Sequence, residues 1–137
     1  MTGLARHEAG STALEFALVA PVFLMVLFLI LDGGRMIFTK QAMNELAVAT
    51  ARCAGIKAPS CTTVSATQSW AATRGLQRSM LPLTSSNVTV VQSTSCNGQS
   101  NMAQATITMT YKKGAMNLLP QSVAPSQLVS TACFPAS

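Results

Sequence analysis

The most prominent feature of the sequence is an uninterrupted apolar run from Phe16 to Leu31, within the stretch Gly10 to Leu31. At about 1.5 Å per helical residue, this run falls short of the roughly 30 Å hydrocarbon core of a bilayer. Thr12 to Leu14 before it and the Gly33-Gly34 pair after it make up the difference. The pattern therefore predicts a membrane-spanning helix. We expect it to bend at Pro21 without ending there, because proline removes only one backbone hydrogen bond.

A single carboxylate, Glu15, stands directly before the apolar run. A charged side chain is costly to bury at the edge of hydrocarbon and is seldom kept there without a partner. Either Glu15 is solvated at the level of the lipid headgroups, or it meets a positive group inside the membrane. The position of Gly10, five residues before Glu15, favours the second interpretation.

Beyond the apolar run, the segment from Asp32 to about Ile56 contains no proline and has apolar residues three and four positions apart, which predicts that the helix continues as a stem. The expected buried stripe consists of Phe38, Ala42, Leu46, Ala49, Cys53 and Ile56. Asp32 and Arg35 have a spacing that would let them pair on the helix surface. The Gly33-Gly34 pair fits a flexible joint and a close-packing site equally well.

A second helix is predicted from Thr63 to Met80, after a break at Ala58 to Cys61. Its expected buried side consists of Val64, Trp70, Ala71, Leu76 and Met80. We expect Trp70 to anchor the core rather than to contact a ligand, because no other aromatic residue accompanies it in this helix.

After Pro82 the pattern changes to a period of two, which predicts strands at Asn87–Gln92, Gln104–Tyr111 and Gln127–Cys133. In the middle strand, Ala105, Ile107, Met109 and Tyr111 share one face and three threonines share the other. The first face should pack on the helices, while the threonine face is either wet or meets a partner. Ser93 to Asn101 is expected to be a loop containing the turn pair Asn97-Gly98. The predicted fold is α+β, a long transmembrane helix continuing into a head with one further helix and a three-stranded antiparallel sheet.

Length and composition limit the chain to one small domain beyond the membrane segment. It has 137 residues, 49% of them hydrophobic and only 9% charged, and the apolar excess lies before residue 57. The net charge is +5, but the nine basic residues are scattered and do not alternate with aromatic residues, which argues against a nucleic-acid surface. They fit a solvated face best, with anionic lipid or an acidic neighbouring subunit as alternatives.

Four cysteines, Cys53, Cys61, Cys96 and Cys133, all follow the apolar segment. If they pair, the head lies in an oxidising compartment. Of the three possible connectivities we favour Cys53 with Cys61 and Cys96 with Cys133, although the sequence does not decide among them. A zinc site is the rival interpretation, and neither a C-x-x-C spacing nor a nearby histidine supports it.

The N-terminal residues resemble a processed leader. Met1 to Gly10 is short and polar, and no signal-peptidase site follows Leu31, so cleavage before the apolar run fits better. The order of Gly10, Glu15 and Phe16 resembles the prepilin peptidase motif of the Flp type. The blocks GSTALEFALVAPVF, LDGGRMIF and KQAMNELAVATARCAG, from Gly10 to Gly55, resemble the TadE-like family of minor pseudopilins of tight adherence pili.

This resemblance implies cleavage between Gly10 and Ser11, which would expose a new amine four residues before Glu15. It also implies that Glu15 pairs with the amine of a neighbouring subunit, where opposite charges relieve each other's desolvation. Phe16 stands where major subunits usually have tyrosine, which favours a minor component. The implied partners are the membrane, prepilin peptidase, other pilin-like subunits and the pilus assembly machinery.

The resemblance also implies a location. We expect a single-pass protein of the bacterial inner membrane with a cytoplasmic N-terminus and a periplasmic head. Incorporation into an extracellular pilus is an open alternative to staying in the membrane. Arg35 and Lys40 outnumber Arg6, which opposes this orientation under the positive-inside rule, whereas the cysteines and the leader favour it. The expected division is 1–10 leader, 11–34 transmembrane segment, 35–57 stem and 58–137 disulfide-braced head.

The sequence does not predict an enzyme. After cleavage the chain would contain no histidine and only three carboxylates, Glu15, Asp32 and Glu45, spread along one helix. No glycine-rich phosphate loop or metal cluster is present, and we expect no cofactor, metal or small-molecule substrate. A structural role in pilus assembly and adhesion is therefore expected. The alternatives are an uncleaved, signal-anchored periplasmic protein-binding domain and a small secreted disulfide protein.

Overall fold

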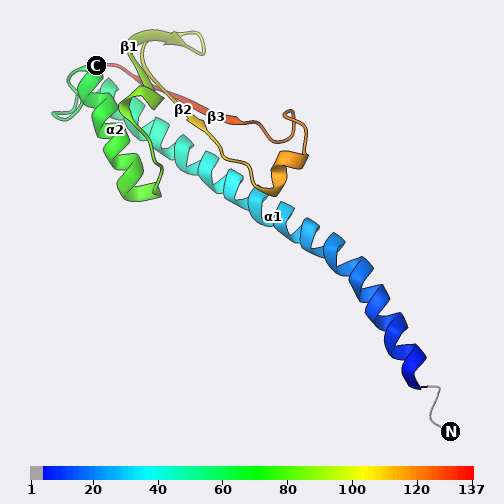
Figure 1. Cartoon of the computed structure of the whole chain (residues 1–137). Coiled ribbons are helices and arrows are strands. Elements are labelled where there is room, and N and C mark those ends of the chain that lie inside the picture. Colours follow the sequence, from blue (N-terminus) through cyan, green and yellow to red (C-terminus); the bar gives the residue numbers. More distant parts are fainter. Residues whose placement is uncertain (1–4) are drawn as a thin grey trace.

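The computed structural model describes the backbone from Ala5 to Ser137 and the side chains from Thr12 onward. The side chains of the predicted processing residues Gly10 and Ser11 therefore lie outside the described part. The elements in chain order are α1 (Ala5–Gly55), α2 (Val64–Ser79), η1 (Ser85–Asn87), β1 (Val88–Cys96), β2 (Gln99–Thr110), η2 (Ala115–Leu118) and β3 (Gln127–Pro135). Figure 1 shows α1 as a long stalk with the other elements gathered around its second half. The predicted α+β fold is confirmed.

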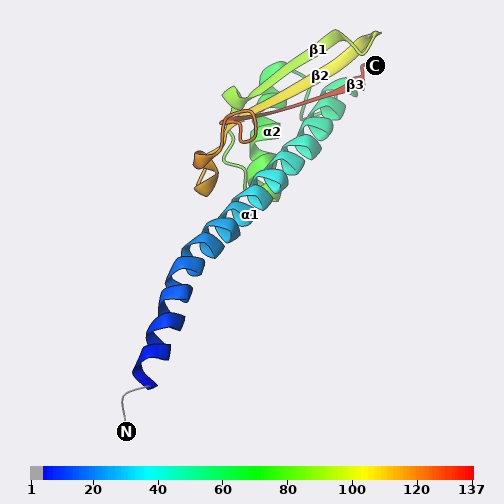
Figure 2. The ribbon, with the colours of Figure 1, turned by 90° about the vertical axis from the view of Figure 1, so that its right-hand side faces the viewer.

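The stalk helix α1 is continuous over 51 residues and includes Pro21 without a break. Proline was expected to bend this helix rather than end it, and Figure 2 shows α1 curving gently on its way from the head to the N-terminus. The helix is long because no other proline or terminating turn occurs before Lys57, where φ is 47° and the helix has ended.

The three strands form one antiparallel sheet in the order β1-β2-β3. In the central strand β2, the side chains of Ala103, Ala105 and Ile107 are fully buried, whereas Thr106 and Thr108 on the other face are half-buried. The buried face packs against α1, as the period of two predicted. On the outer face the Oγ1 atoms of Thr106 and Thr131 are 3.0 Å apart, within hydrogen-bond distance.

The first hairpin is longer than expected. Ser93 to Asn101 was expected to be a loop, but β1 extends to Cys96 and β2 begins at Gln99. Only Asn97 and Gly98 form the turn, with φ of 52° and 81°. Positive φ at both central residues is the geometry of the two-residue hairpin turn that asparagine and glycine favour. The loop prediction was wrong because these strand residues are polar and extend beyond the core, so they show no apolar alternation.

The core lies between the sheet and the two helices. Its buried members are Met43, Leu46, Ala47 and Ala54 of α1, Ala71 of α2, Leu81 and Leu83 of the following segment, and Val88, Val90, Ala103, Ile107 and Leu128 of the sheet. The predicted stem stripe is correct for Leu46 and Cys53 but wrong for Phe38 and Ile56, which are 75% and 51% exposed. Compared with the prediction, the buried face of α1 is rotated toward small residues, because α1 lies close to both α2 and the sheet.

The second helix has the predicted extent, but of its predicted buried side only Ala71 is fully buried. Thr63 caps its N-terminus, accepting a hydrogen bond from the backbone N–H of Ala66, and Met80 ends it in the left-handed conformation. Its buried residues are Thr67, Ala71 and Gly75. The predicted Val64, Leu76 and Met80 are exposed, and Trp70 is half-buried. Small residues face α1 because a Cβ at Gly75 would lie only 3.0 Å from Cδ2 of Leu46.

Candidate membrane and assembly site

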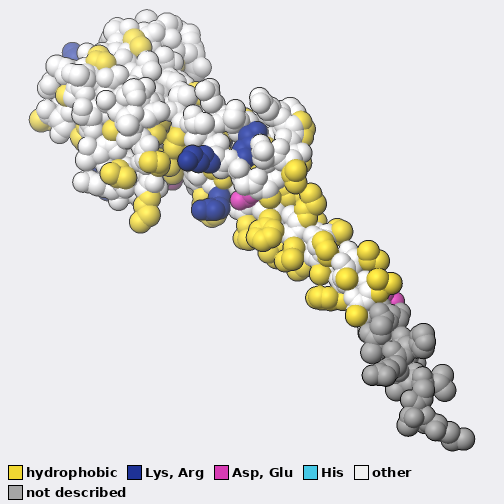
Figure 3. All heavy atoms as spheres, viewed as in Figure 1, with side chains coloured by type: hydrophobic (Ala, Val, Ile, Leu, Met, Phe, Trp, Pro, Cys, Tyr) yellow, Lys and Arg dark blue, Asp and Glu magenta, His cyan; other side chains and the backbone are white. Residues whose placement is uncertain are grey.

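The apolar part of α1 has no cover within the described chain. The most hydrophobic 18-residue window of its Thr12–Gly55 portion has a mean hydropathy of 2.7, and none of that window is buried. Figure 3 shows this stalk below the head as almost wholly apolar. Glu15 and Phe16 are both exposed at its start, Phe16 by 73%. A helix that is apolar on all sides and long enough to span a bilayer is suited to lipid or to packing against other helices.

The end of the apolar run is attached to the head through Asp32. Its carboxylate accepts a hydrogen bond from the backbone N–H of Ala115, and its backbone carbonyl accepts one of 3.3 Å from the Tyr111 hydroxyl. A Cβ at Gly114 would lie 2.5 Å from Oδ2 of Asp32, so only glycine allows this approach. The expected pairing of Asp32 with Arg35 is thus replaced by a contact with the head. The sequence contains no signal for this contact, because the residues are 83 positions apart.

Two disulfides brace the head at the end farthest from the apolar run. Cys53 is bonded to Cys61, and Cys96 is bonded to Cys133. This is the pairing that the sequence favoured. The first disulfide attaches the turn after α1 to the end of the stem, and the second links β1 to β3, the strands on either side of β2.

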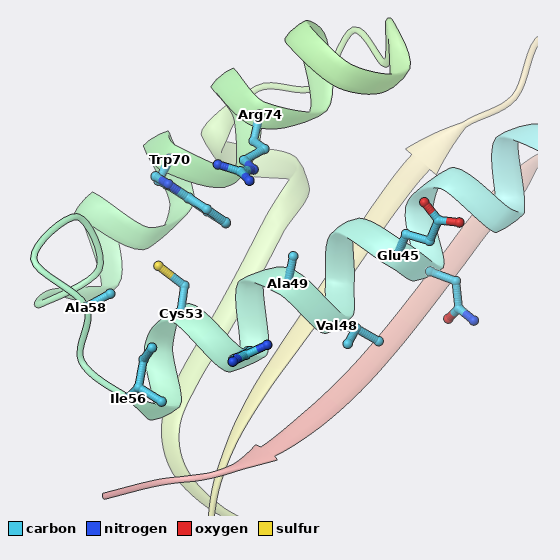
Figure 4. Close-up of a pocket in the computed structure, with 10 residues that line it drawn as sticks. Glu45, Val48, Ala49, Cys53, Ile56, Ala58, Trp70 and Arg74 are labelled. Carbon is cyan, nitrogen blue, oxygen red and sulfur yellow. The ribbon is translucent and has the colours of Figure 1, made fainter.

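A groove of about 580 Å³ lies between α1 and α2, and no sequence pattern predicted it. Figure 4 shows Trp70 and Arg74 of α2 facing Ala49 and Cys53 of α1 across this groove. The Arg74 guanidinium lies over the Trp70 ring, 5.0 Å from its centroid, a cation–π arrangement. Trp70 packs partly against the core, as expected of an anchor, and also forms one wall of the groove.

The acidic and metal-ligating side chains in the described part of the chain are dispersed. From Thr12 onward, no three His, Cys, Asp or Glu residues gather closely enough to hold a metal ion. Glu15, Asp32 and Glu45 are spread along α1, and Asp32 is already engaged by the head. What these residues offer is surface for packing: an apolar helix with one carboxylate at its start, and a folded head fixed to its other end.

These features define a class of protein. In the described part of the chain one helix, near the N-terminus, is long and apolar enough to cross a membrane, which indicates a single-pass membrane protein with a small α+β head. Residues 10–52 match the family model of the TadE-like proteins. This match confirms the resemblance over the N-terminal part of the chain, and a TadE-like domain implies involvement in the Tad pilus system. The TadE-like pilus family is structural rather than enzymatic. No curated protein and no solved structure matches the chain.

Proposed function

We propose that the protein is a minor pilin-like, or pseudopilin, structural component of a tight adherence (Tad/Flp) type IV pilus system, acting in pilus assembly and adhesion. The observation that carries this proposal is the TadE-like match over residues 10–52, which contains Gly10, Glu15 and the whole apolar run. Within the described chain the apolar run is uncovered, so this helix can pack against the helices of other subunits.

In this proposal prepilin peptidase cuts between Gly10 and Ser11, and α1 then begins with a free amine. Glu15 lies about one helical turn from that amine, so it can reach the amine of a neighbouring subunit whose helix is shifted along the axis. Opposite charges that meet in hydrocarbon offset each other's desolvation, whereas an isolated carboxylate does not. Packing of helices in a membrane also favours small side chains and polar contacts, both present in α1.

The proposed location is the bacterial inner membrane, with the N-terminus in the cytoplasm and the head in the periplasm. Two disulfides in the head support this orientation, because disulfides persist in oxidising compartments. Incorporation into the extracellular pilus would follow from release of the helix from the membrane into a bundle of pilin-like helices.

The test is the N-terminal residue of the mature protein, measured by intact mass in cells with and without the cognate prepilin peptidase. We expect a start at Ser11 that depends on the peptidase. Gly10→Leu should retain the full-length mass, whereas Gly33→Ala, a glycine substitution in the same helix, should be processed normally. A wild-type chain that keeps Met1 in the presence of the peptidase would contradict the proposal.

The second candidate function is an uncleaved, signal-anchored domain that binds an envelope protein through its head. The groove between α1 and α2 favours it, because Val48, Ile56 and Trp70 give the groove apolar walls. In that case Val48→Asp should abolish partner binding while Glu15→Ala leaves it intact. The pseudopilin proposal expects Glu15→Ala to impair assembly, so the pair of variants separates the two functions.

A further inference from the structure

Basic side chains gather where the apolar run ends. Arg35 lies four positions after Leu31, about 6 Å further along the helix. Lys112 and Lys113 follow β2 after one residue, Tyr111, and precede Gly114, which lies against the Asp32 carboxylate. We call these three residues, Arg35, Lys112 and Lys113, the basic collar. Figure 3 shows dark blue side chains around this junction and none along the apolar stalk below it.

The fold holds the two lysines at this depth. Tyr111, immediately before them, donates its hydroxyl hydrogen bond to the carbonyl of Asp32, and Ala115, just after Gly114, donates its backbone N–H to the Asp32 carboxylate. The segment between these two contacts cannot move far from Asp32, which directly follows the last apolar residue. If the apolar run occupies hydrocarbon, Lys112 and Lys113 lie at the level of the headgroups.

The collar surrounds a hollow rather than a flat surface. A depression of about 720 Å³ is lined by all three collar residues together with Tyr111 and Met80, whose side chain is 87% exposed. Among the side chains from Thr12 onward, Asp32 is the only carboxylate that lines it, and that carboxylate already accepts a hydrogen bond from Ala115. Leu118 of η2, in the segment that follows the lysines, is 68% exposed. Cations beside exposed apolar side chains are typical of surfaces that lie in a membrane interface.

We propose that the basic collar binds the headgroups of anionic phospholipids, with a lipid phosphate in the hollow between Arg35, Lys112 and Lys113. Two observations favour an anionic lipid as the ligand. The collar is positively charged, and the membrane-spanning helix leaves the head at the same place. Lysine and arginine near an anionic membrane surface each strengthen binding about fivefold. The inference depends on the membrane-spanning helix alone and holds whether or not the leader is cleaved.

The experiment uses the full chain in lipid nanodiscs of phosphatidylcholine and phosphatidylglycerol at a molar ratio of 3:1. Native mass spectrometry then gives the ratio of the two lipids that remain bound to the released protein. We expect enrichment of phosphatidylglycerol above the bulk ratio. Lys112→Gln combined with Lys113→Gln should reduce that enrichment severalfold, and ammonium acetate at high concentration should reduce it in the wild type.

The matched control is Arg52→Gln combined with Lys57→Asn, which removes the same charge at the opposite end of the head. Both residues are exposed, and asparagine tolerates the positive φ of 47° at position 57. This control should keep the lipid preference of the wild type, and both double variants should unfold at the wild-type temperature in nanodiscs of phosphatidylcholine alone.

Two outcomes would overturn the proposal. One is a wild-type chain that retains the two lipids in their bulk ratio, which would leave the collar free for an acidic protein partner. The other is an equal loss of enrichment in the collar variant and the control variant, which would show that lipid preference depends on net charge and not on the collar. Neither outcome bears on the cleavage at Gly10, so this proposal and the proposed function fail separately.

Discussion

Asp32 and Ala115 are joined by a hydrogen bond between the carboxylate at the end of the apolar run and a backbone N–H 83 positions later. Because the Ala115 N–H is partly buried, loss of its acceptor leaves it without a compensating partner. This contact fixes the η2 segment, and with it Lys112 and Lys113, beside the stalk. It is the point at which the head and the membrane segment meet.

Asp32→Ala is expected to lower the free energy of unfolding of the head by about 1 kcal/mol, the low end of the penalty for an unpaired buried donor, because the Ala115 N–H is only partly buried. Asp32→Asn should lose less, since its amide oxygen still accepts a hydrogen bond. Thermal unfolding of the full chain in detergent, followed by Trp70 fluorescence, measures the stability. Amide hydrogen exchange should rise first at residues 112–119. Glu45→Ala, at an exposed position on the same helix, is the control and should have little effect.

Two glycines of α1 should respond differently to substitution by alanine. A Cβ at Gly55 would lie 2.7 Å from the carbonyl oxygen of Pro135, so the backbone of the C-terminal segment must shift. A Cβ at Gly33 would meet nothing within 4 Å. We expect Gly55→Ala to destabilise the head by about 1–3 kcal/mol. Gly33→Ala should be neutral or stabilise the helix by about 0.5 kcal/mol. Equal effects in urea unfolding would contradict this packing.

The two disulfides should contribute unequally to stability. Cys53 and Cys61 close a loop of sequence separation 8, whereas Cys96 and Cys133 close one of 37. In the chain-entropy description the longer loop stabilises by about 4 kcal/mol and the shorter by about 2.5 kcal/mol. Removing Cys96 and Cys133 together by alanine should therefore lower the urea midpoint more than removing Cys53 and Cys61. Peptide mapping without reduction checks the pairing first.

Glu15 should matter for assembly and not for folding. Glu15 is exposed and far from the head, so Glu15→Gln should leave the unfolding temperature of the head unchanged. Copurification with other pilin-like subunits from membranes should fall strongly, because the neutral amide cannot offset the charge of a neighbouring amine. Glu45→Gln, which removes a carboxylate from the stem, serves as the comparison. Undiminished copurification of Glu15→Gln would assign Glu15 to the solvated headgroup level.

The sequence predicted the helices and strands better than it predicted which of their side chains are buried. The apolar run, the second helix and the alternation in β2 were each visible because hydrophobic periodicity is a local property. The buried side of α2 was predicted correctly only at Ala71, since burial there depends on how closely α1 approaches. Thr67, Ala71 and Gly75 face the stem because they are small, while the larger Leu76 and Met80 are exposed.

The candidate site likewise contains residues that the sequence could identify and contacts that it could not. Glu15, Phe16 and the cysteines could be selected from their positions in the sequence, because each stands out from its neighbours. The hydrogen bond from Ala115 to Asp32 and the groove beside Trp70 depend on elements that meet only in the folded head. Asp32 looked like a surface partner for Arg35, and nothing near it in the sequence pointed to a residue in η2.

The Asp32 contact also changes the mechanical role of the Gly33-Gly34 pair. On one side of the pair, Asp32 is held by Tyr111 and Ala115; on the other, Met36 packs against the core and Met43 lies within it. The head thus contacts α1 on both sides of the glycines, so they cannot act as a free hinge. Any tilt of the helix in the bilayer must then rotate the whole head with it, so a pull on the head is transmitted as torque to the membrane segment.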